Sequence, residues 1–272
     1  MSFDVGVTLP AVYDCSIQQG VKRAARAGAD AVEFYDWTDV DVADVQKTAA
    51  DNGVAISGTV ATGVASNVGD PDSGAICDPE EYDQGVDDIE RSIETTAELG
   101  GDTLIVTVGP RIDTLSEATQ QNAIVRVLRS VAPTAEANDV TIVPEPLNTR
   151  VNHSGYFLRT ADRGFSIVEA VDSPNVKLLY DVYHQQITEG NIIQTLREHI
   201  DLVGHIHIAD VPGRHEPGTG ELDYHNILSA IDEMGYEGVV ACEFFPSGDS
   251  DDPVRHVVEM ADDVRYTGRQ KS

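Results

Sequence analysis

Short apolar runs rich in β-branched residues alternate along the chain with longer amphipathic stretches, and Gly or Pro marks most of the boundaries. Apolar runs of about four to eight residues between turn residues are typical of buried strands. They predict strands at 3–8, 31–34, 54–57, 103–107, 140–144, 176–179, 203–208 and 239–243. The amphipathic stretches predict helices at 17–27, 40–51, 82–99, 116–138, 160–171, 191–199, 224–234 and 253–266.

Strands that alternate with helices favour parallel pairing through right-handed crossovers. The predicted strands are apolar on both faces, as expected where helices cover a parallel sheet. Their number and the length of 272 residues predict an α/β fold, a (β/α)8 TIM barrel, with residues 1–272 as a single domain. A doubly wound open sheet is the alternative, but no Gly-rich phosphate loop follows the first strand. The Gly-, Asp- and Ser-rich segment 61–79 predicts a long loop that serves as a lid or a binding loop.

The composition narrows the classes of function. Asp and Glu number 47 against 18 Lys and Arg, which gives a formal net charge of −29. Such a field repels nucleic-acid phosphates and anionic membrane surfaces, so neither is expected as a partner. Only four of the basic residues are lysines, and the acidic residues are spread along the chain, which favours a halophilic protein of a high-salt cytoplasm over an ordinary acidic one.

The cysteines and the apolar runs indicate the compartment. Cys15, Cys77 and Cys242 are an odd number without the spacing of a disulfide framework, which predicts a reducing environment. No apolar run approaches the ~20 residues of a membrane span, and the chain opens without a signal-like segment. A soluble, cytoplasmic protein is therefore expected.

Four consecutive predicted strands deliver a metal-ligand type of side chain near their carboxyl ends. Glu145, Asp181, His207 and Glu243 follow this pattern, and in a barrel these strand ends share one rim. Three carboxylates and an imidazole suit Mn²⁺ or Mg²⁺, and Co²⁺ would also fit. A single acidic residue after a strand is more often a helix N-cap or a solvated loop residue, so the inference depends on all four together. Asp210 competes with His207 as the ligand from the seventh strand.

Polar residues in the following loops are candidates for substrate contacts. His184 lies in the turn after the sixth strand, and Arg214 lies in a Pro- and Gly-rich loop after the seventh. Arg214 could grip a substrate oxygen or carboxylate, or it could form an ion pair with Glu216 or Glu221 that holds the loop. Trp37 could wall the pocket or pack in the core.

The segments 143–149, 154–158, 178–190, 204–224 and 242–246 resemble the xylose-isomerase-like TIM-barrel superfamily, and within it the hydroxypyruvate isomerase family. The resemblance implies that Glu145, Asp181, His207 and Glu243 bind the metal. It further implies that Glu145 and Glu243 are the catalytic acid and base, and that His184 and Arg214 contact the substrate. The implied reaction is the conversion of hydroxypyruvate to tartronate semialdehyde through an enediolate.

One difference from the pattern of the hydroxypyruvate isomerase family leaves alternative functions open. Hydroxypyruvate isomerases often carry Gln where this chain has His207, and histidine there is similar to the ketose 3-epimerases of the superfamily. The alternatives are a ketose 3-epimerase, a dehydratase or decarboxylase of a related sugar acid, and a sugar-acid-binding protein without turnover. The superfamily's DNA-repair endonucleases are His-rich with several zinc ions, a ligand set this chain lacks. The expected partner is a small hydroxycarbonyl compound, and a homo-oligomer is compatible with the sequence.

Overall fold

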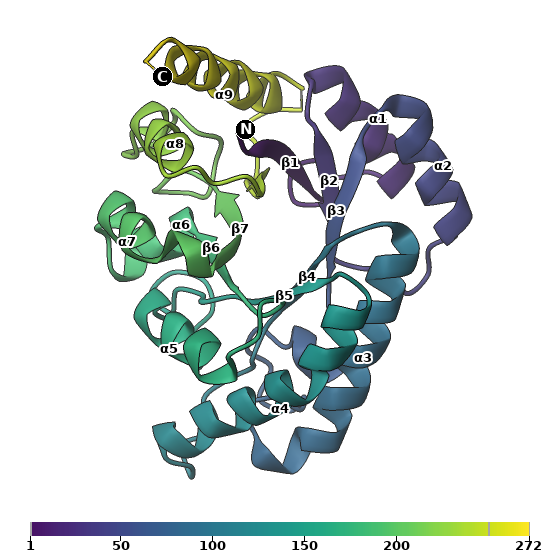
Figure 1. Ribbon diagram of the computed structural model, residues 1–272, viewed down its shortest axis with the longest axis vertical. Helices are drawn as coiled ribbons and strands as arrows, with labels where there is room; N and C mark the ends of the chain where they lie inside the picture. The colour runs from purple at the N-terminus through teal and green to yellow at the C-terminus, as the bar shows by residue number, and fades with distance from the viewer. Residues whose placement is uncertain (1, 250, 272) are drawn as a thin grey trace.

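Eight parallel strands form the centre of the molecule in a computed structural model that describes residues 2–249 and 251–271 (Figure 1). Neighbouring strands are hydrogen-bonded in the order β5-β4-β3-β2-β1-β8-β7-β6. Their bounds are β1 Asp4–Leu9, β2 Ala31–Phe34, β3 Ala55–Val60, β4 Thr103–Val106, β5 Thr141–Pro144, β6 Leu178–Asp181, β7 Val203–Ile208 and β8 Val239–Cys242. The two outermost strands of this order approach each other, which makes the sheet a nearly closed barrel.

The junction between β5 and β6 is a parallel bridge between Ile142 and Val176. The Ile142 N–H donates to the carbonyl of Asn175 at 2.8 Å, and the Lys177 N–H donates to the carbonyl of Ile142 at 3.0 Å. The strand β6 begins two residues later than predicted, so its hydrogen-bonded ladder with β5 is short. The (β/α)8 prediction is confirmed, with this junction as the weakest part of the ring.

Helices surround the barrel and cover the outer faces of its strands (Figure 1). They are α1 Ile17–Ala27, α2 Val42–Asn52, α3 Tyr82–Leu99, α4 Glu117–Ala137, α5 Ala161–Val171, α6 Val182–Thr188, α7 Ile192–His199, α8 Tyr224–Glu233 and α9 Asp252–Lys271, with the 3-10 turns η1 Gly63–Ser66, η2 Pro79–Glu81 and η3 Ile200–Leu202. The sequence pattern missed α6, whose seven residues are too few to show a helical period. In the part of the chain that the structure describes, no helix has the length and hydrophobicity needed to cross a membrane.

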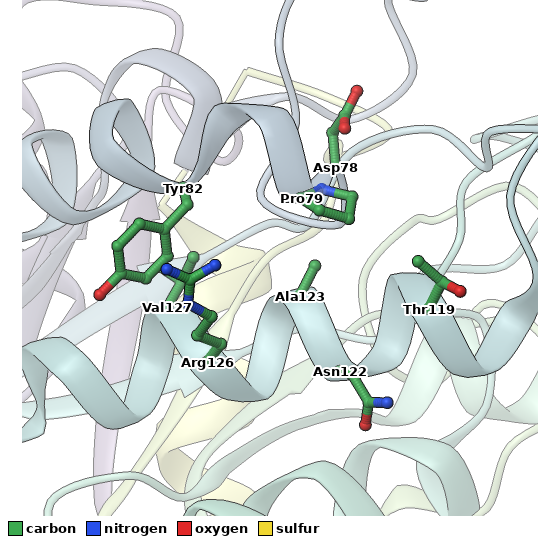
Figure 2. A pocket seen from close by; sticks show the side chains of 8 residues that line it. All are labelled: Asp78, Pro79, Tyr82, Thr119, Asn122, Ala123, Arg126 and Val127. Atoms are coloured by element: carbon green, nitrogen blue, oxygen red, sulfur yellow. The ribbon is translucent and has the colours of Figure 1, made fainter.

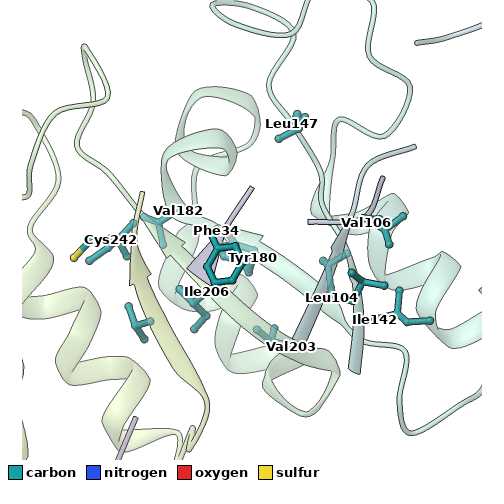
Figure 3. Packing of buried hydrophobic residues seen from close by; sticks show 14 of the residues in the cluster. Phe34, Leu104, Val106, Ile142, Leu147, Tyr180, Val182, Val203, Ile206 and Cys242 are labelled. Carbon is teal, nitrogen blue, oxygen red and sulfur yellow. The ribbon is translucent and has the colours of Figure 1, made fainter. Parts of the chain in front are cut away.

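The two faces of the strands bury different sets of side chains. Leu104, Ile142, Ile206 and Cys242 point outward and pack in the core between barrel and helices (Figure 3). Ile105, Val143 and Leu179 form a separate small cluster inside the barrel. Strand alternation explains this division, because successive residues point to opposite faces. It also explains why Cys242 lies in the outer core while its neighbour Glu243 lies at the rim.

Candidate metal and substrate site

Four side chains converge at the carboxyl-terminal rim of the barrel. Glu145 directly follows β5, Asp181 ends β6, His207 lies in β7, and Glu243 directly follows β8. Each offers one ligand-type atom, and these four atoms lie within 4.8 Å of one another. The Nδ1 atom of His207 is 3.2 Å from Glu243 Oε2 and 3.5 Å from Glu145 Oε1. The structure thus brings together all four residues that the strand ends suggested.

The charges in this cluster influence one another strongly because all four side chains are buried. Burial and the negative charges of Glu243 and Glu145 raise the pKa of Asp181 to about 7. Burial likewise raises the pKa of Glu145. For Glu243, burial opposes ionisation, but Arg214 and His207 outweigh it and hold the pKa well below its usual range. Asp181 and Glu145 thus resist ionisation despite the neighbouring Arg214, and an added cation would stabilise their ionised forms.

A divalent cation would fit these residues. Glu145 Oε1 and His207 Nδ1 are buried atoms that have no hydrogen-bond partner among the described residues. Both belong to the cluster, and a buried polar atom without a partner is costly unless a ligand satisfies it. Oxygen-rich donor sets with one imidazole are typical of Mn²⁺ and Mg²⁺ sites. Glu145, Asp181, His207 and Glu243 are therefore the residues that could hold such an ion.

Arg214 lies beside this cluster rather than pairing with its loop neighbours. Its guanidinium forms an ion pair with Glu243 and lies 3.9 Å from Asp181 Oδ2, so Glu216 and Glu221 are not its partners. The Arg214 backbone has φ 57°, a left-handed conformation that is uncommon outside glycine. Such strain is concentrated at functional sites, where the surroundings hold it in place.

The loop that carries Arg214 is organised by Asp210. Each oxygen of this buried carboxylate accepts two backbone N–H groups, at 2.8 to 3.1 Å; the donors are Val211 and Leu222 for Oδ1, and Gly218 and Gly220 for Oδ2. A Cβ at Gly220 would lie 2.2 Å from a carbonyl oxygen, so only glycine allows the loop to approach this closely. Asp210 therefore holds the loop, and it does not belong to the four-residue cluster at the rim.

His184 lies in α6, and its neighbours fix the orientation and the tautomer of its ring. Its Nδ1 accepts the backbone N–H of Asn148 at 3.1 Å, which leaves the hydrogen of the neutral ring on Nε2. Burial and the charge of Arg214 lower the pKa of His184 well below normal, which favours the neutral ring. Nε2 is 3.6 Å from Asp181 Oδ2. A buried, neutral imidazole with a free N–H beside the cluster can donate a hydrogen bond to a substrate oxygen.

A cavity of about 370 Å³ opens above the cluster. Its wall includes Glu145, Glu243 and Arg214, and also Ser66 and Val68 from the 61–79 segment. The segment therefore reaches the wall of the cavity, which is compatible with the predicted binding loop. Trp37 is absent from the lining; it packs in the outer core, with its Nε1–H donating to the carbonyl of Val60 at 2.9 Å.

A second hollow lies outside the barrel, between η2, the start of α3 and the helix α4 (Figure 2). Arg126 stacks over the ring of Tyr82, with its Cζ atom 3.7 Å from the ring centroid. Asp78 caps η2 by accepting the N–H of Glu80 at 3.0 Å. These polar side chains are engaged in contacts that stabilise the local structure.

Sequence reasoning missed three polar residues next to the cluster. Tyr35 donates a hydrogen bond to Glu243, and Glu33 contacts both His205 and His207 inside the barrel. Two signals were available. His205 and His207 are two residues apart in one strand and so point to the same face, and Glu33 interrupts an otherwise apolar strand.

Comparisons with known proteins identify the family of the chain. The family model described as xylose isomerase-like TIM barrel matches residues 21–264, so the chain belongs to this family. The chain is 38% identical over 158 residues to the 2-oxo-tetronate isomerase of Cupriavidus necator, an alignment that covers 58% of this chain and 60% of that protein. The chain thus spans less than two thirds of that relative.

A second relative is covered more completely. The chain is 29% identical to the hydroxypyruvate isomerase of Escherichia coli K12 over 83% of this chain and 86% of the relative. The resemblance to this family is therefore confirmed. A solved structure of an L-ribulose 3-epimerase superposes with a TM-score of 0.83 at 23% identity, over 100% of this chain and 98% of the other. At that identity the likeness concerns the fold.

Proposed function

We propose that the protein is a metal-dependent isomerase of small α-hydroxycarbonyl acids, of the hydroxypyruvate isomerase type. The observation that carries the proposal is the convergence of Glu145, Asp181, His207 and Glu243 within 4.8 Å, beside a cavity that Glu145 and Glu243 line. The names of the two isomerase relatives support it. The expected reaction converts hydroxypyruvate to tartronate semialdehyde.

Glu145 and Glu243 both line the cavity and are suited to move protons. A bound Mn²⁺ or Mg²⁺ would stabilise negative charge on the substrate oxygens and so acidify the adjacent C–H bond. One glutamate removes the proton from the carbon that bears the hydroxyl group, which leaves an enediolate. The other glutamate delivers a proton to the former carbonyl carbon. The hydroxyl oxygen loses its proton and the former carbonyl oxygen gains one, so substrate and product have the same formula.

Arg214 and His184 would orient the substrate for this transfer. Arg214 lines the cavity and presents a planar set of N–H donors that suits a carboxylate or two neighbouring oxygens. His184 offers its Nε2–H beside Asp181, 3.6 Å from Oδ2. Together the two donors match a short substrate with a carboxylate next to its carbonyl group.

The first test is turnover of hydroxypyruvate by the Mn²⁺-treated protein and by the chelator-treated protein, with exchange of the substrate C–H for solvent deuterium as a second readout. Glu243→Gln removes one proton-transfer group and should lower the rate by about 10²- to 10⁴-fold. The matched control is Glu237→Gln, because Glu237 is exposed and precedes the same strand, at the opposite end of the barrel. A Glu243→Gln variant that keeps more than about a tenth of the rate contradicts the proposal.

A ketose 3-epimerase is the second candidate, and His207 is the observation that favours it. The same two glutamates would then act on opposite faces of one carbon. Separate incubations with hydroxypyruvate and with free ketoses, followed by product analysis, distinguish the two. A product of lower mass would identify a dehydratase or decarboxylase instead. Ligand-induced stabilisation without deuterium exchange would identify a binding protein.

A further inference from the structure

A buried polar network lies inside the barrel, directly below the rim. Glu33 Oε1 is 2.7 Å from His207 Nε2 and accepts the Thr8 hydroxyl at 2.6 Å. Glu33 Oε2 is 2.7 Å from His205 Nε2. All four side chains are at most 1% exposed. Oε1 thus has hydrogen-bond partners that fix the position of the carboxylate, whereas Oε2 lies close to His205 without forming a hydrogen bond among the described residues.

The strand register brings these residues together. Thr8 and Glu33 are paired neighbours in β1 and β2. His205 and His207 are two residues apart in β7 and therefore face the same side, the barrel interior. On β4, β5 and β6 the interior is filled by Ile105, Val143 and Leu179. Because apolar side chains fill the interior there, packing alone does not require a carboxylate at position 33.

Glu33 faces the Nε2 atom of His207 at 2.7 Å, and a carboxylate only accepts hydrogen bonds, so this nitrogen must carry a hydrogen. Nδ1 faces Glu145 and Glu243, 3.5 and 3.2 Å away, and without a cation these two carboxylates favour a hydrogen on Nδ1 as well. A cation between the carboxylates would favour loss of the Nδ1 hydrogen, whereas Glu33 would retain the hydrogen on Nε2. The opposite tautomer would put a hydrogen on Nδ1, which cannot then bind a cation.

We propose that Glu33 is a positioning residue that holds the proton of His207 on Nε2, and thereby keeps Nδ1 available to a divalent cation in the rim cluster. The inference rests on the metal site of the proposed function and adds a residue to it that does not touch the ion. Carboxylates in this role, one step behind a ligating histidine, typically change metal affinity by about 10- to 100-fold when they are replaced.

Glu33→Gln tests the proposal because it preserves size and shape but replaces one acceptor oxygen with an NH₂ donor. Mn²⁺ is titrated calorimetrically into the metal-free full chain and the variant. We expect the dissociation constant of the variant to rise about 10- to 100-fold. The matched control is Asp88→Asn, which converts another buried carboxylate, one that accepts the Val64 N–H at 3.0 Å on the outer side of the barrel. This control should lower the melting temperature and leave the Mn²⁺ affinity unchanged.

The outcomes separate the two proposals. A folded Glu33→Gln variant whose Mn²⁺ dissociation constant is within about twofold of the wild type overturns the role of Glu33 and leaves the metal site intact. A wild-type chain that binds no Mn²⁺ overturns the metal site and the role of Glu33 with it.

If Glu33→Gln does not fold, a measurement on the wild type tests whether Glu33 holds the hydrogen on Nε2 of His207. With ¹⁵N-labelled histidine and saturating Mg²⁺, His207 should show a protonated Nε2 whose hydrogen exchanges slowly with solvent. A protonated Nδ1 and an unprotonated Nε2 would overturn the proposal.

Discussion

Replacing Asp210 with Asn tests the assignment of this residue to the loop rather than to the metal. The carboxylate is 0% exposed, and each of its oxygens accepts two backbone N–H groups from the 211–222 segment. Asn keeps one oxygen, so two N–H groups would face an NH₂ group instead of an acceptor. Hydrogen bonds to a charged acceptor contribute about 1.5 to 3 kcal/mol each, and part of the loss is recovered when the loop relaxes toward water. We expect the free energy of unfolding to fall by about 2 to 4 kcal/mol.

Equilibrium unfolding in urea, with chelator present, measures this change. In a chain of this size a loss of that magnitude lowers the melting temperature by about 5 to 12 °C. The Mn²⁺ affinity of the folded variant should stay close to that of the wild type, because Asp210 does not belong to the rim cluster. A free energy of unfolding within about 0.5 kcal/mol of the wild type would refute the structural reasoning. A collapse of Mn²⁺ affinity would instead make Asp210 a ligand.

Three further predictions follow from burial and charge. Because Asp181 has a pKa of about 7 without a cation, protons compete with Mn²⁺ for this carboxylate below that pH. The Mn²⁺ affinity should therefore fall by up to about tenfold for each pH unit between roughly pH 7 and pH 5. A calorimetrically measured affinity that does not change with pH would contradict this. Leu179→Ala opens a cavity inside the barrel beside Ile105 and Val143, and urea denaturation should show a loss of about 2 to 5 kcal/mol, whereas a loss below about 1 kcal/mol would mean that the interior is not packed there. Burial raises the pKa of Cys77 to about 12, so a thiol reagent at pH 8 should modify only the partly exposed Cys15 in the native protein; rapid modification of Cys77 would count against its burial.

The barrel and the residues at its rim could be predicted from the sequence because both depend on short-range patterns. Strands that alternate with helices can close only in a few ways, and strand ends such as Glu145 and Glu243 then share a rim by topology. The helix α6 escaped detection because it is short and begins within the strand-end motif itself, where Asp181 accepts the N–H of His184 at 2.9 Å. Its presence explains why His184 points back toward the cluster.

Contacts between segments that lie far apart in the sequence could not be predicted from the pattern of hydrophobic and polar residues. Glu33 and His207 are 174 positions apart. The acidic residue in an apolar strand signals a buried polar group, but the sequence does not show that its partner is a histidine of the seventh strand. Arg214 shows the same limit, because sequence reasoning considered the nearby Glu216 and Glu221, whereas the partner is Glu243, 29 positions away. Such pairings depend on how strands are ordered around the barrel, and charge alone does not determine them.

The short β5–β6 junction has a consequence for the mechanics of the barrel. Glu145 and Asp181 stand at the ends of these two strands, on either side of the place where the ring has its fewest backbone hydrogen bonds. An ion held by both carboxylates would cross-link the two strands where the ladder does not. Occupancy of the site and resistance of the ring to local opening would then be thermodynamically linked, so that removal of the ion also makes the barrel easier to open.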